Sequence, residues 1–249
     1  MGRVLDYLTE RLRGGPLHFT LIDPEKSPGE TAGRIARDAV AAGSDLILLG
    51  GSTGISPGGI GDAAAAVKAS VPVPVVIFPE GPSSLTPKAD AVLFMSLLNS
   101  RNLDLVIRVH ARAAPAIRAM GIEPIPMGYL VIAPGMRVGE VGAVDAVPRD
   151  DPALAEGYAL AAQYLGMRMV YLEAGSGAPS PIPSAMVERV ARAIEIPLIV
   201  GGGIRSPADA RMLLGAGARV LVTGTIAESG RLGDDFRGIV SEVRRARGG

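Results

Sequence analysis

Short apolar runs rich in valine, isoleucine and leucine recur along the chain. There are eight, at residues 17–22, 45–50, 74–78, 91–95, 125–132, 167–172, 197–200 and 219–224. Few of these runs alternate apolar and polar positions. Continuous apolar runs of this length are typical of parallel strands buried on both faces, so the pattern predicts a parallel sheet.

Helical patterns lie between most of these runs. Residues 30–42 place small and apolar side chains on one helical face, and Gly43 is the expected stop. Ser206, Pro207 and Asp209 predict a helix start, with a serine cap, a proline at the first helical position and an acid two residues later. Alternating strands and helices predict an α/β fold, a (β/α)₈ TIM barrel, as a single domain over residues 1–249.

One connection departs from this alternation. Only twelve residues, 79–90, separate the third and fourth runs, and three of them are prolines. This is too short and too rich in proline for a crossover helix with two loops. The sequence therefore predicts a barrel whose third helix is reduced or missing, with a side opening suited to a long ligand. The alternative is that one strand has been divided wrongly into two.

Composition narrows the functional class. The 249 residues carry 25 basic and 25 acidic side chains, which argues against a nucleic-acid binder. The chain has no cysteine and only two histidines, so disulfides, thiolate catalysis and a three-histidine metal centre are excluded. The charged N-terminus is not a signal sequence, and no run approaches the roughly 18 apolar residues of a membrane span. We expect a cytoplasmic protein, with Arg244, Arg245 and Arg247 forming a solvated helix end.

Two glycine-rich segments follow the last two predicted strands. Residues 201–205 read GGGIR and residues 223–225 read TGT. In a barrel of this kind the active site lies in the loops after the strands, and glycine lets backbone N–H groups approach a phosphate closely. The two segments predict a phosphate site, although glycines also serve tight turns. Arg205 is expected either to pair with the phosphate or to lie exposed in the first helical turn.

A second anionic site is indicated beside the first two strands. Asp23 ends the first strand, and Ser52 or Thr53 follows the second. One acid with a hydroxyl suits magnesium, which keeps most of its waters and binds substrate phosphates. The alternative for Asp23 is a turn residue that caps its own loop. Lys26 is either an anion contact or a surface residue.

Glu173 ends the sixth strand directly before a Gly-Ser-Gly turn. An acid at a strand tip, next to a bound phosphate ester, is placed to act as a general base. Tyr171 points to the same side of the strand and either hydrogen-bonds the ligand or fills the barrel interior. His18 is expected to be a hydrogen-bonded barrel residue, and His110 to be structural.

Five stretches, in this order, resemble the archaeal geranylgeranylglyceryl phosphate synthase family: HFTLIDPEK (18–26), GGSTGI (50–55), YLEAGSGAP (171–179), VGGGIRSP (200–207) and VTGT (222–225). The resemblance covers essentially the whole chain. It implies a modified TIM barrel without its third helix. It also implies transfer of a C20 prenyl group from geranylgeranyl diphosphate to sn-glycerol 1-phosphate, which forms the first ether bond of archaeal membrane lipids and uses Mg²⁺.

The resemblance also implies roles for particular residues. Asp23 and Ser52 match the metal positions, with Thr53 as a second possible hydroxyl donor. Glu173 matches the base that deprotonates the glycerol 3-hydroxyl. The glycerol phosphate contacts correspond to Tyr171, Leu172, Glu173, Ala174, Gly175, Ser176, Gly177, Gly202, Gly203, Gly224 and Thr225.

Assembly and product release are less defined by the resemblance. Residues 126–135 are similar to the branch of the family that forms larger assemblies, which implies a homo-oligomer, either a dimer or a hexamer. The greasy product implies a transient membrane contact for its release, although no surface-binding helix is evident in the sequence.

Three other functions share the phosphate signal. The first is the same reaction with a longer prenyl diphosphate, as in bacterial relatives. The second is an isomerase or lyase acting on a phosphorylated metabolite, which the lack of cysteine, and of lysine in any predicted strand, disfavours. The third is a non-catalytic barrel that binds a phosphorylated ligand and has no need of Glu173.

Overall fold

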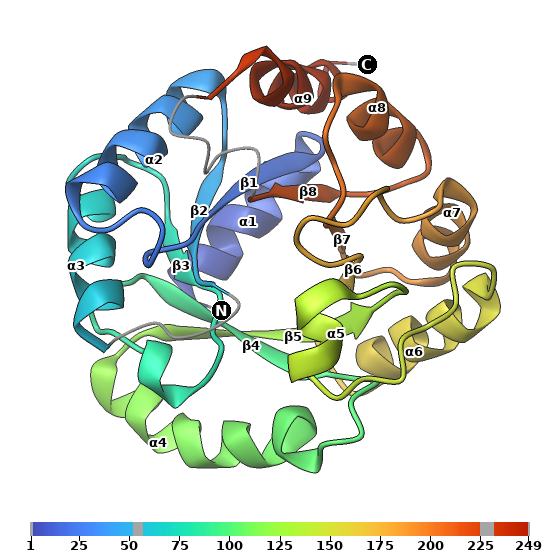
Figure 1. The fold of residues 1–249 in the computed structure, drawn as a ribbon, viewed down its shortest axis with the longest axis horizontal. Helices are drawn as coiled ribbons and strands as arrows, with labels where there is room; N and C mark the ends of the chain where they lie inside the picture. The colour runs from blue at the N-terminus through green and yellow to red at the C-terminus, as the bar shows by residue number, and fades with distance from the viewer. Residues whose placement is uncertain (1, 52–56, 225–231, 249) are drawn as a thin grey trace.

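The computed structural model describes residues 2–51, 57–224 and 232–248. Eight parallel strands close into a barrel in sequence order (Figure 1). Their bounds are β1 Leu17–Ile22, β2 Leu46–Leu49, β3 Val75–Ile77, β4 Ala91–Leu97, β5 Glu123–Val131, β6 Met169–Glu173, β7 Leu198–Gly201 and β8 Val220–Thr223. The predicted TIM barrel is confirmed, and each predicted run overlaps one strand, although β4, β5, β6 and β7 extend beyond the predicted bounds.

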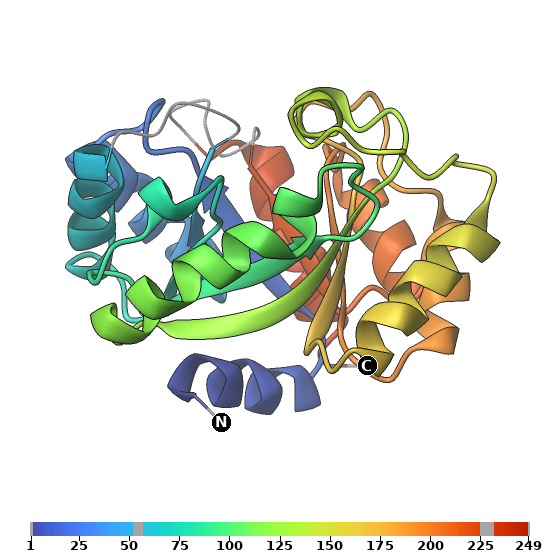
Figure 2. The same ribbon diagram turned by 90° about the horizontal axis from the view of Figure 1, so that it is seen from below.

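Helices surround the barrel as the alternating pattern predicted. They are α2 Glu30–Ala42, α3 Pro57–Lys68, α4 Val109–Met120, α6 Pro152–Tyr164, α7 Ser184–Ala193, α8 Pro207–Gly215 and α9 Asp234–Arg245. The short helix α5, Met136–Val141, lies instead above the ends of the strands (Figure 2). A π-helical turn, η2 Asp104–Arg108, leads into α4. Helix α2 has the predicted bounds, and it ends at Gly43 because this residue adopts a left-handed conformation, with φ of 117°.

The predicted start of α8 is also confirmed. Ser206 accepts a hydrogen bond from the Asp209 N–H, and the Asp209 carboxylate accepts one from the Ser206 N–H, with Pro207 at the first helical position. This capping box satisfies backbone donors that the helix itself leaves free.

The connection between β3 and β4 lacks an α-helix throughout residues 78–90, all of which are described. Only a three-residue 3₁₀ turn, η1 Pro82–Ser84, stands in its place. The prediction of a reduced third helix is therefore confirmed. Helix α4 packs beside η1 in this part of the barrel.

The core has one layer inside the barrel and a second between the strands and the helices. Inside, alternate strand residues such as Phe19, Leu48 and Met127 pack together. Helix α1, Arg3–Arg13, closes the bottom of the barrel with Val4 and Leu8 and lies opposite α5 and the loops that follow the strands (Figure 2). Since each strand has a buried side chain on both faces, its sequence is almost continuously apolar.

Candidate active site

The carboxylate of Glu173 lies buried at the end of β6. Its side chain is 7% exposed. The Tyr129 hydroxyl donates to Oε2 over 3.1 Å, and the Gly175 N–H donates to Oε1 over 2.6 Å. The acid that the sequence placed at a strand tip is thus held in one orientation by hydrogen bonds from β5 and from its own following loop.

The surroundings of the Glu173 carboxylate make it a good proton acceptor. Burial raises the pKa of Glu173 above its ordinary value, while hydrogen bonds from Gly175, Tyr129 and Tyr171 act in the opposite direction. Burial, followed by the nearby Glu173 charge, raises the pKa of Tyr129 and of Tyr171 well above the usual value. Both phenols therefore stay protonated and act as donors to a basic carboxylate.

Two glycines at the end of β7 make room for this cluster. A Cβ on Gly201 would lie 1.9 Å from the Tyr171 hydroxyl oxygen. A Cβ on Gly202 would lie 2.5 Å from Glu173 Oε1, and the φ of Gly202 is +81°. Glycine is therefore required at both positions for the backbone of β7 to approach the carboxylate and its tyrosine.

Tyr171 lies beneath the carboxylate inside the barrel. It is 2% exposed, and its ring meets that of Tyr129 edge-on with centroids 5.1 Å apart. It therefore fills the barrel interior, as one of the two predictions for it held, and it hydrogen-bonds Glu173, which neither prediction included. The predicted hydrogen bond to a ligand stays a prediction. Tyr129 is the residue that the sequence reasoning missed, although the inward-facing spacing Met127, Tyr129, Val131 was a signal that could have indicated it.

The other predicted residues of the β6 loop divide into two groups. The side chains of Leu172 and Ala174 face the outer core, so only their backbone is available to a ligand. Ser176 faces the groove described below. Gly175 and Gly177 adopt φ of +99° and +77°, which lets the loop turn back over the strand ends.

The predicted phosphate residues follow β7 and β8. Gly202 and Gly203 come directly after β7, and Gly224 comes directly after β8. Thr225 lies outside the described residues. Gly203 has φ of +70°, and a Cβ there would lie 2.4 Å from the Ser180 carbonyl oxygen. The two neighbouring glycine loops place backbone close to the site without side chains in between, as a phosphate site requires.

Arg205 is exposed, as one alternative predicted, but it lies before the first turn of α8 and makes contacts that neither alternative included. Its guanidinium donates to the carbonyl oxygens of Gly177 and Ala178, over 3.0 and 2.9 Å. The side chain therefore ties the loop after β6 to the loop after β7. This cross-link holds the two loops of the predicted acceptor site in a fixed relation.

Asp23 directly follows β1, with its carboxylate at the edge of the same site. Its Oδ1 accepts the Glu25 N–H over 3.0 Å, and Oδ2 lies 3.7 Å from Lys26 Nζ. Asp23 thus caps its own turn and also faces the groove, and Lys26 lines that groove too. Gly51 brings the loop after β2 against the Asp23 carboxylate. Ser52 and Thr53, the predicted second metal donors, lie outside the described residues.

An apolar groove extends from this site past η1, where the barrel lacks an α-helix between β3 and β4. At one end it is bordered by Asp23, Glu173 and Gly224. It continues between η1, with Pro82 and Leu85, and the inner face of α4. Its farther wall includes Val92, Phe94, Val109, Ala113 and Ile117. A long apolar ligand is the chemistry that suits a groove of this composition.

Helix α5 forms part of the groove rim. Val138 and Val141 line it, and Arg137 stands at the same rim. None of these three was identified from the sequence, because α5 is a six-residue insertion between β5 and α6 whose place above the barrel depends on tertiary packing. His110 also lines the groove, where its Nε2 lies 2.7 Å from the Met95 carbonyl oxygen, a structural contact as predicted.

Comparison with known proteins agrees with this site. Residues 6–243 match the model of the PcrB family. The chain is 50% identical over 228 residues to the geranylgeranylglyceryl phosphate synthase of Thermoplasma acidophilum, covering 92% of this chain and 90% of that protein. It is 47% identical to the enzyme of the same name from Pyrococcus abyssi, covering 98% of each.

A solved structure shows the same fold at high similarity. The crystal structure of (S)-3-O-geranylgeranylglyceryl phosphate synthase from Thermoplasma acidophilum, in complex with its substrate sn-glycerol-1-phosphate, superposes with a TM-score of 0.95 at 48% identity. The match covers 98% of this chain and 100% of that one.

Proposed function

This chain belongs to the PcrB family, and from that premise we propose that it is a prenyltransferase that joins geranylgeranyl diphosphate to the 3-hydroxyl of sn-glycerol 1-phosphate. The proposal rests on one observation above all. A buried, hydrogen-bonded carboxylate, Glu173, stands where two glycine loops meet the head of an apolar groove. That juxtaposition fits a phosphorylated alcohol on one side and a long apolar chain on the other.

Glu173 is the base in this proposal. It takes the proton from the glycerol 3-hydroxyl, and the freed oxygen forms a bond to the first carbon of the prenyl chain. The bond from that carbon to the diphosphate breaks, and its electron pair leaves with the diphosphate. Burial favours the neutral acid that Glu173 becomes, so the proton transfer relieves the cost of a buried charge.

Tyr129 and Tyr171 orient the base. Both hydroxyls donate to the carboxylate, and their raised pKa values keep them protonated over the physiological range. The Gly175 N–H fixes the other oxygen. With its rotation restricted in this way, Glu173 is held in one orientation beside Gly202 of the loop after β7.

The apolar groove is the proposed binding site of the prenyl tail. The tail would lie along η1 and α4, with its diphosphate end near Asp23 and Lys26. Aliphatic lining also keeps water from the reacting carbon, which carries positive character as the diphosphate leaves.

Magnesium is the proposed cofactor. Within the described residues no cluster of three or more histidine or acidic side chains could hold a metal alone. Asp23, whose side chain is 13% exposed at the groove edge, fits a magnesium ion that takes most of its ligands from water and diphosphate. Ser52 is the second ligand that the resemblance implies. When bound, magnesium supplies positive charge to the departing diphosphate.

The first test is direct synthesis. The purified protein would be incubated with magnesium, geranylgeranyl diphosphate and either sn-glycerol 1-phosphate or its 3-phosphate enantiomer, and ether would be sought by mass spectrometry. Ether from the 1-phosphate alone is the expected result. Absence of ether from both enantiomers would contradict the proposal.

Chain length is tested in the same assay. Geranylgeranyl and heptaprenyl diphosphate would compete for one pool of acceptor, and the ratio of the two ethers would be measured. We expect the C20 ether to dominate. A dominant C35 ether would favour the longer-chain reaction of the same family.

Assembly and membrane contact are further proposals. We expect a homo-oligomer, a dimer or a hexamer, which light scattering would establish. No helix in the described ranges is long and apolar enough to cross a bilayer. Because the ether product is apolar, its transfer to a lipid surface is proposed as a transient contact.

A further inference from the structure

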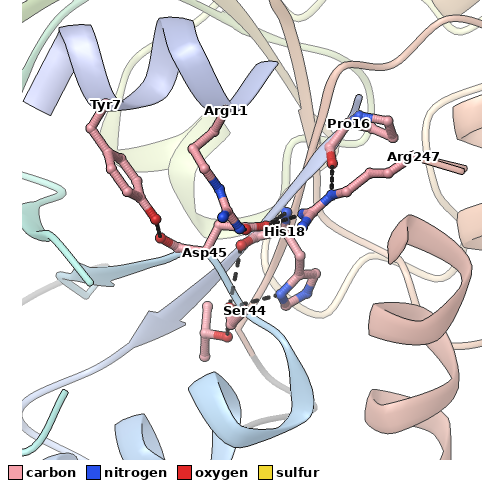
Figure 3. Close-up of polar contacts among 8 residues, drawn as sticks. Tyr7, Arg11, Pro16, His18, Ser44, Asp45 and Arg247 are labelled. Carbon is pink, nitrogen blue, oxygen red and sulfur yellow. Dashed lines mark hydrogen bonds and ion pairs between the residues drawn. The ribbon is translucent and has the colours of Figure 1, made fainter. Parts of the chain in front are cut away.

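A buried polar chain runs between β1, β8 and the bottom of the barrel. It consists of His18 and Thr20 on β1, Ser44 and Asp45 before β2, and Thr223 at the end of β8. Figure 3 shows His18, Ser44 and Asp45 of this chain. All five are at most 4% exposed. Their side chains lie in the layer between strands and helices, which is otherwise filled by residues such as Ile22 and Ile47.

His18 is the centre of this chain. Its Nδ1 lies 2.9 Å from Ser44 Oγ, and its Nε2 lies 3.1 Å from Thr223 Oγ1. Burial lowers the pKa of His18 to about 4, so at neutral pH the ring carries one proton. Whichever nitrogen holds that proton, the ring donates to one hydroxyl and accepts from the other. Phe236 of α9 packs edge-on against the ring, with centroids 5.4 Å apart, and holds its orientation.

Asp45 links this polar chain to helix α1 and to the residues after α9. One carboxylate oxygen accepts the His18 N–H over 3.0 Å. The carboxylate also pairs with Arg11 from α1 and with Arg247 beyond α9 (Figure 3). Arg247 further donates to the Pro16 carbonyl oxygen over 2.7 Å. These contacts tie the start of β1 to α1 and to the residues after α9. The backbone of His18 is therefore fixed in position, and its ring can position another segment.

The segment it reaches is the predicted phosphate loop. Thr223 is the last residue of β8, and Gly224 directly after it borders the groove head. Thr223 also stands opposite Thr20 in the parallel register of β1 and β8. Because the hydroxyl of Thr223 is held by His18, the peptide that follows has a defined direction. In an otherwise apolar layer, a satisfied polar contact of this kind specifies one geometry where apolar packing allows several.

We propose that His18 is a positioning residue for the acceptor phosphate: through its Nε2 contact with Thr223 it holds the end of β8 and the backbone of Gly224 in the orientation that receives the phosphate of the glycerol substrate. His18 touches no substrate. The inference rests on the proposed function for the identity of that substrate, while the positioning itself concerns any phosphate bound at these loops.

Amide variants separate the two ring contacts. In His18→Gln the amide reaches the position of Nε2 and keeps the Thr223 contact. In His18→Asn the amide reaches only the position of Nδ1 and loses it. Thr223→Val removes the hydroxyl and keeps the branched shape. Ile47→Val, in the same buried layer, is a control that lowers stability without touching the chain.

Steady-state kinetics with both substrates is the measurement, alongside melting temperatures. We expect His18→Asn and Thr223→Val each to raise KM for sn-glycerol 1-phosphate about tenfold, with KM for the prenyl diphosphate changed less than about twofold. His18→Gln should restore most of the acceptor KM. The double variant His18→Asn/Thr223→Val should be no worse than either single one, because both break the same bond.

Other outcomes would overturn the proposal. An unchanged acceptor KM in both His18→Asn and Thr223→Val would do so. The proposal would also be overturned if the two variants raised KM for both substrates equally and in proportion to their loss of melting temperature, as expected for a change of stability alone such as Ile47→Val. If His18→Asn fails to fold, Thr223→Val decides alone.

A separate probe distinguishes failure of this inference from failure of the proposed function. Calorimetric titration with inorganic phosphate needs only the phosphate loops and no prenyl transfer. If the wild-type protein makes no ether, the proposed reaction fails. Weaker phosphate binding by Thr223→Val, with near-normal binding by His18→Gln and Ile47→Val, would still support positioning by His18. Equal binding by the wild type and these three variants would refute it.

Discussion

Glu173 joins two properties in one residue, a raised pKa from burial and a fixed orientation from its hydrogen bonds to Gly175, Tyr129 and Tyr171. We expect Glu173→Gln to lower kcat by about 10² to 10⁴, the usual worth of a general base, with little change in binding of sn-glycerol 1-phosphate. Turnover and calorimetric affinity measure the two effects separately. Glu188→Gln on the exposed face of α7 is the matched control. Turnover equal to wild type in Glu173→Gln would remove the proposed base.

The same carboxylate predicts an acidic limb in the pH profile. The base works only when ionised, and burial raises its pKa, so kcat should fall as the pH drops through a range above that of an ordinary glutamate.

Asp23 is the residue on which the metal proposal depends. Asp23→Asn keeps the shape and the oxygen that caps the Glu25 N–H but removes the charge. We expect it to need a higher magnesium concentration for half-maximal turnover, because the ion loses its protein carboxylate. Magnesium titrations of this variant and of the exposed control Asp62→Asn provide the comparison. Superimposable titrations would refute the assignment.

His18 makes stability depend on pH in a defined window. Its pKa in the folded protein is about 4, against 6.5 as the ordinary value. Between these limits the unfolded chain binds a proton that the folded one does not. Stability is therefore complete above pH 6.5 and is lost as the pH falls toward 4, by about 3 kcal/mol for this shift. Urea unfolding of wild type and His18→Gln across the window measures it, and parallel curves would contradict it.

At the scale of elements, the short β3–β4 connection has the largest consequence. Where an outer helix would cover β3 and β4, only η1 is present, and the space becomes a groove closed on its far side by α4. Three prolines and a twelve-residue span allowed the missing helix to be predicted from the sequence. The walls of the groove could not be predicted, because they come from η1, α4 and α5 together.

Filling that groove should affect one substrate alone. Ala113 lies on its α4 wall and is buried. In Ala113→Phe we expect KM for geranylgeranyl diphosphate to rise about tenfold, and farnesyl diphosphate to be affected less, since added bulk shortens the space for the tail. The acceptor KM should stay near wild type.

Ala116→Phe on the exposed side of α4 controls for changes in the helix. An equal effect of Ala113→Phe on C15 and C20 donors would argue against a tail bound along α4.

At the scale of the whole molecule, Asp45 fastens the two chain ends to the barrel. The prediction that Arg244, Arg245 and Arg247 form a solvated end was wrong for Arg247, which is 21% exposed and paired with this buried carboxylate. Long basic side chains near a C-terminus usually extend into water. Here the end of the chain after α9 returns to the start of β1, which no local pattern records.

Removing that charge should destabilise the fold. Asp45→Asn leaves Arg11, Arg247 and the His18 N–H with a weaker partner in a buried position, and we expect a loss of about 1–3 kcal/mol. Asp104→Asn, in an exposed pair with Arg112, should cost less than about 1 kcal/mol. Denaturant unfolding gives both values. Equal losses in the two variants would show that burial of Asp45 adds nothing.

The order of strands and helices, the reduced third helix, the glycine loops and the position of Glu173 could all be read from the sequence. Each depends on residues close together in the chain, whose spacing reflects the period of a strand or the conformational needs of a turn. The roles given to the site residues stay predictions, and for Ser52 and Thr225 the positions do as well, since both residues lie outside the described part of the chain.

The tertiary structure alone decided which distant residues meet. Tyr129 reaches Glu173 across 44 residues, Arg247 reaches Asp45 across 202, and His18 reaches Thr223 across 205. Such pairs depend on barrel closure and on the register between strands, to which every element contributes. Local periodicity carries no information about them. The position of Glu173, the proposed base, could therefore be read from the sequence, while its hydrogen-bond partners, the groove walls and the link to the predicted phosphate loop are evident only in the folded molecule.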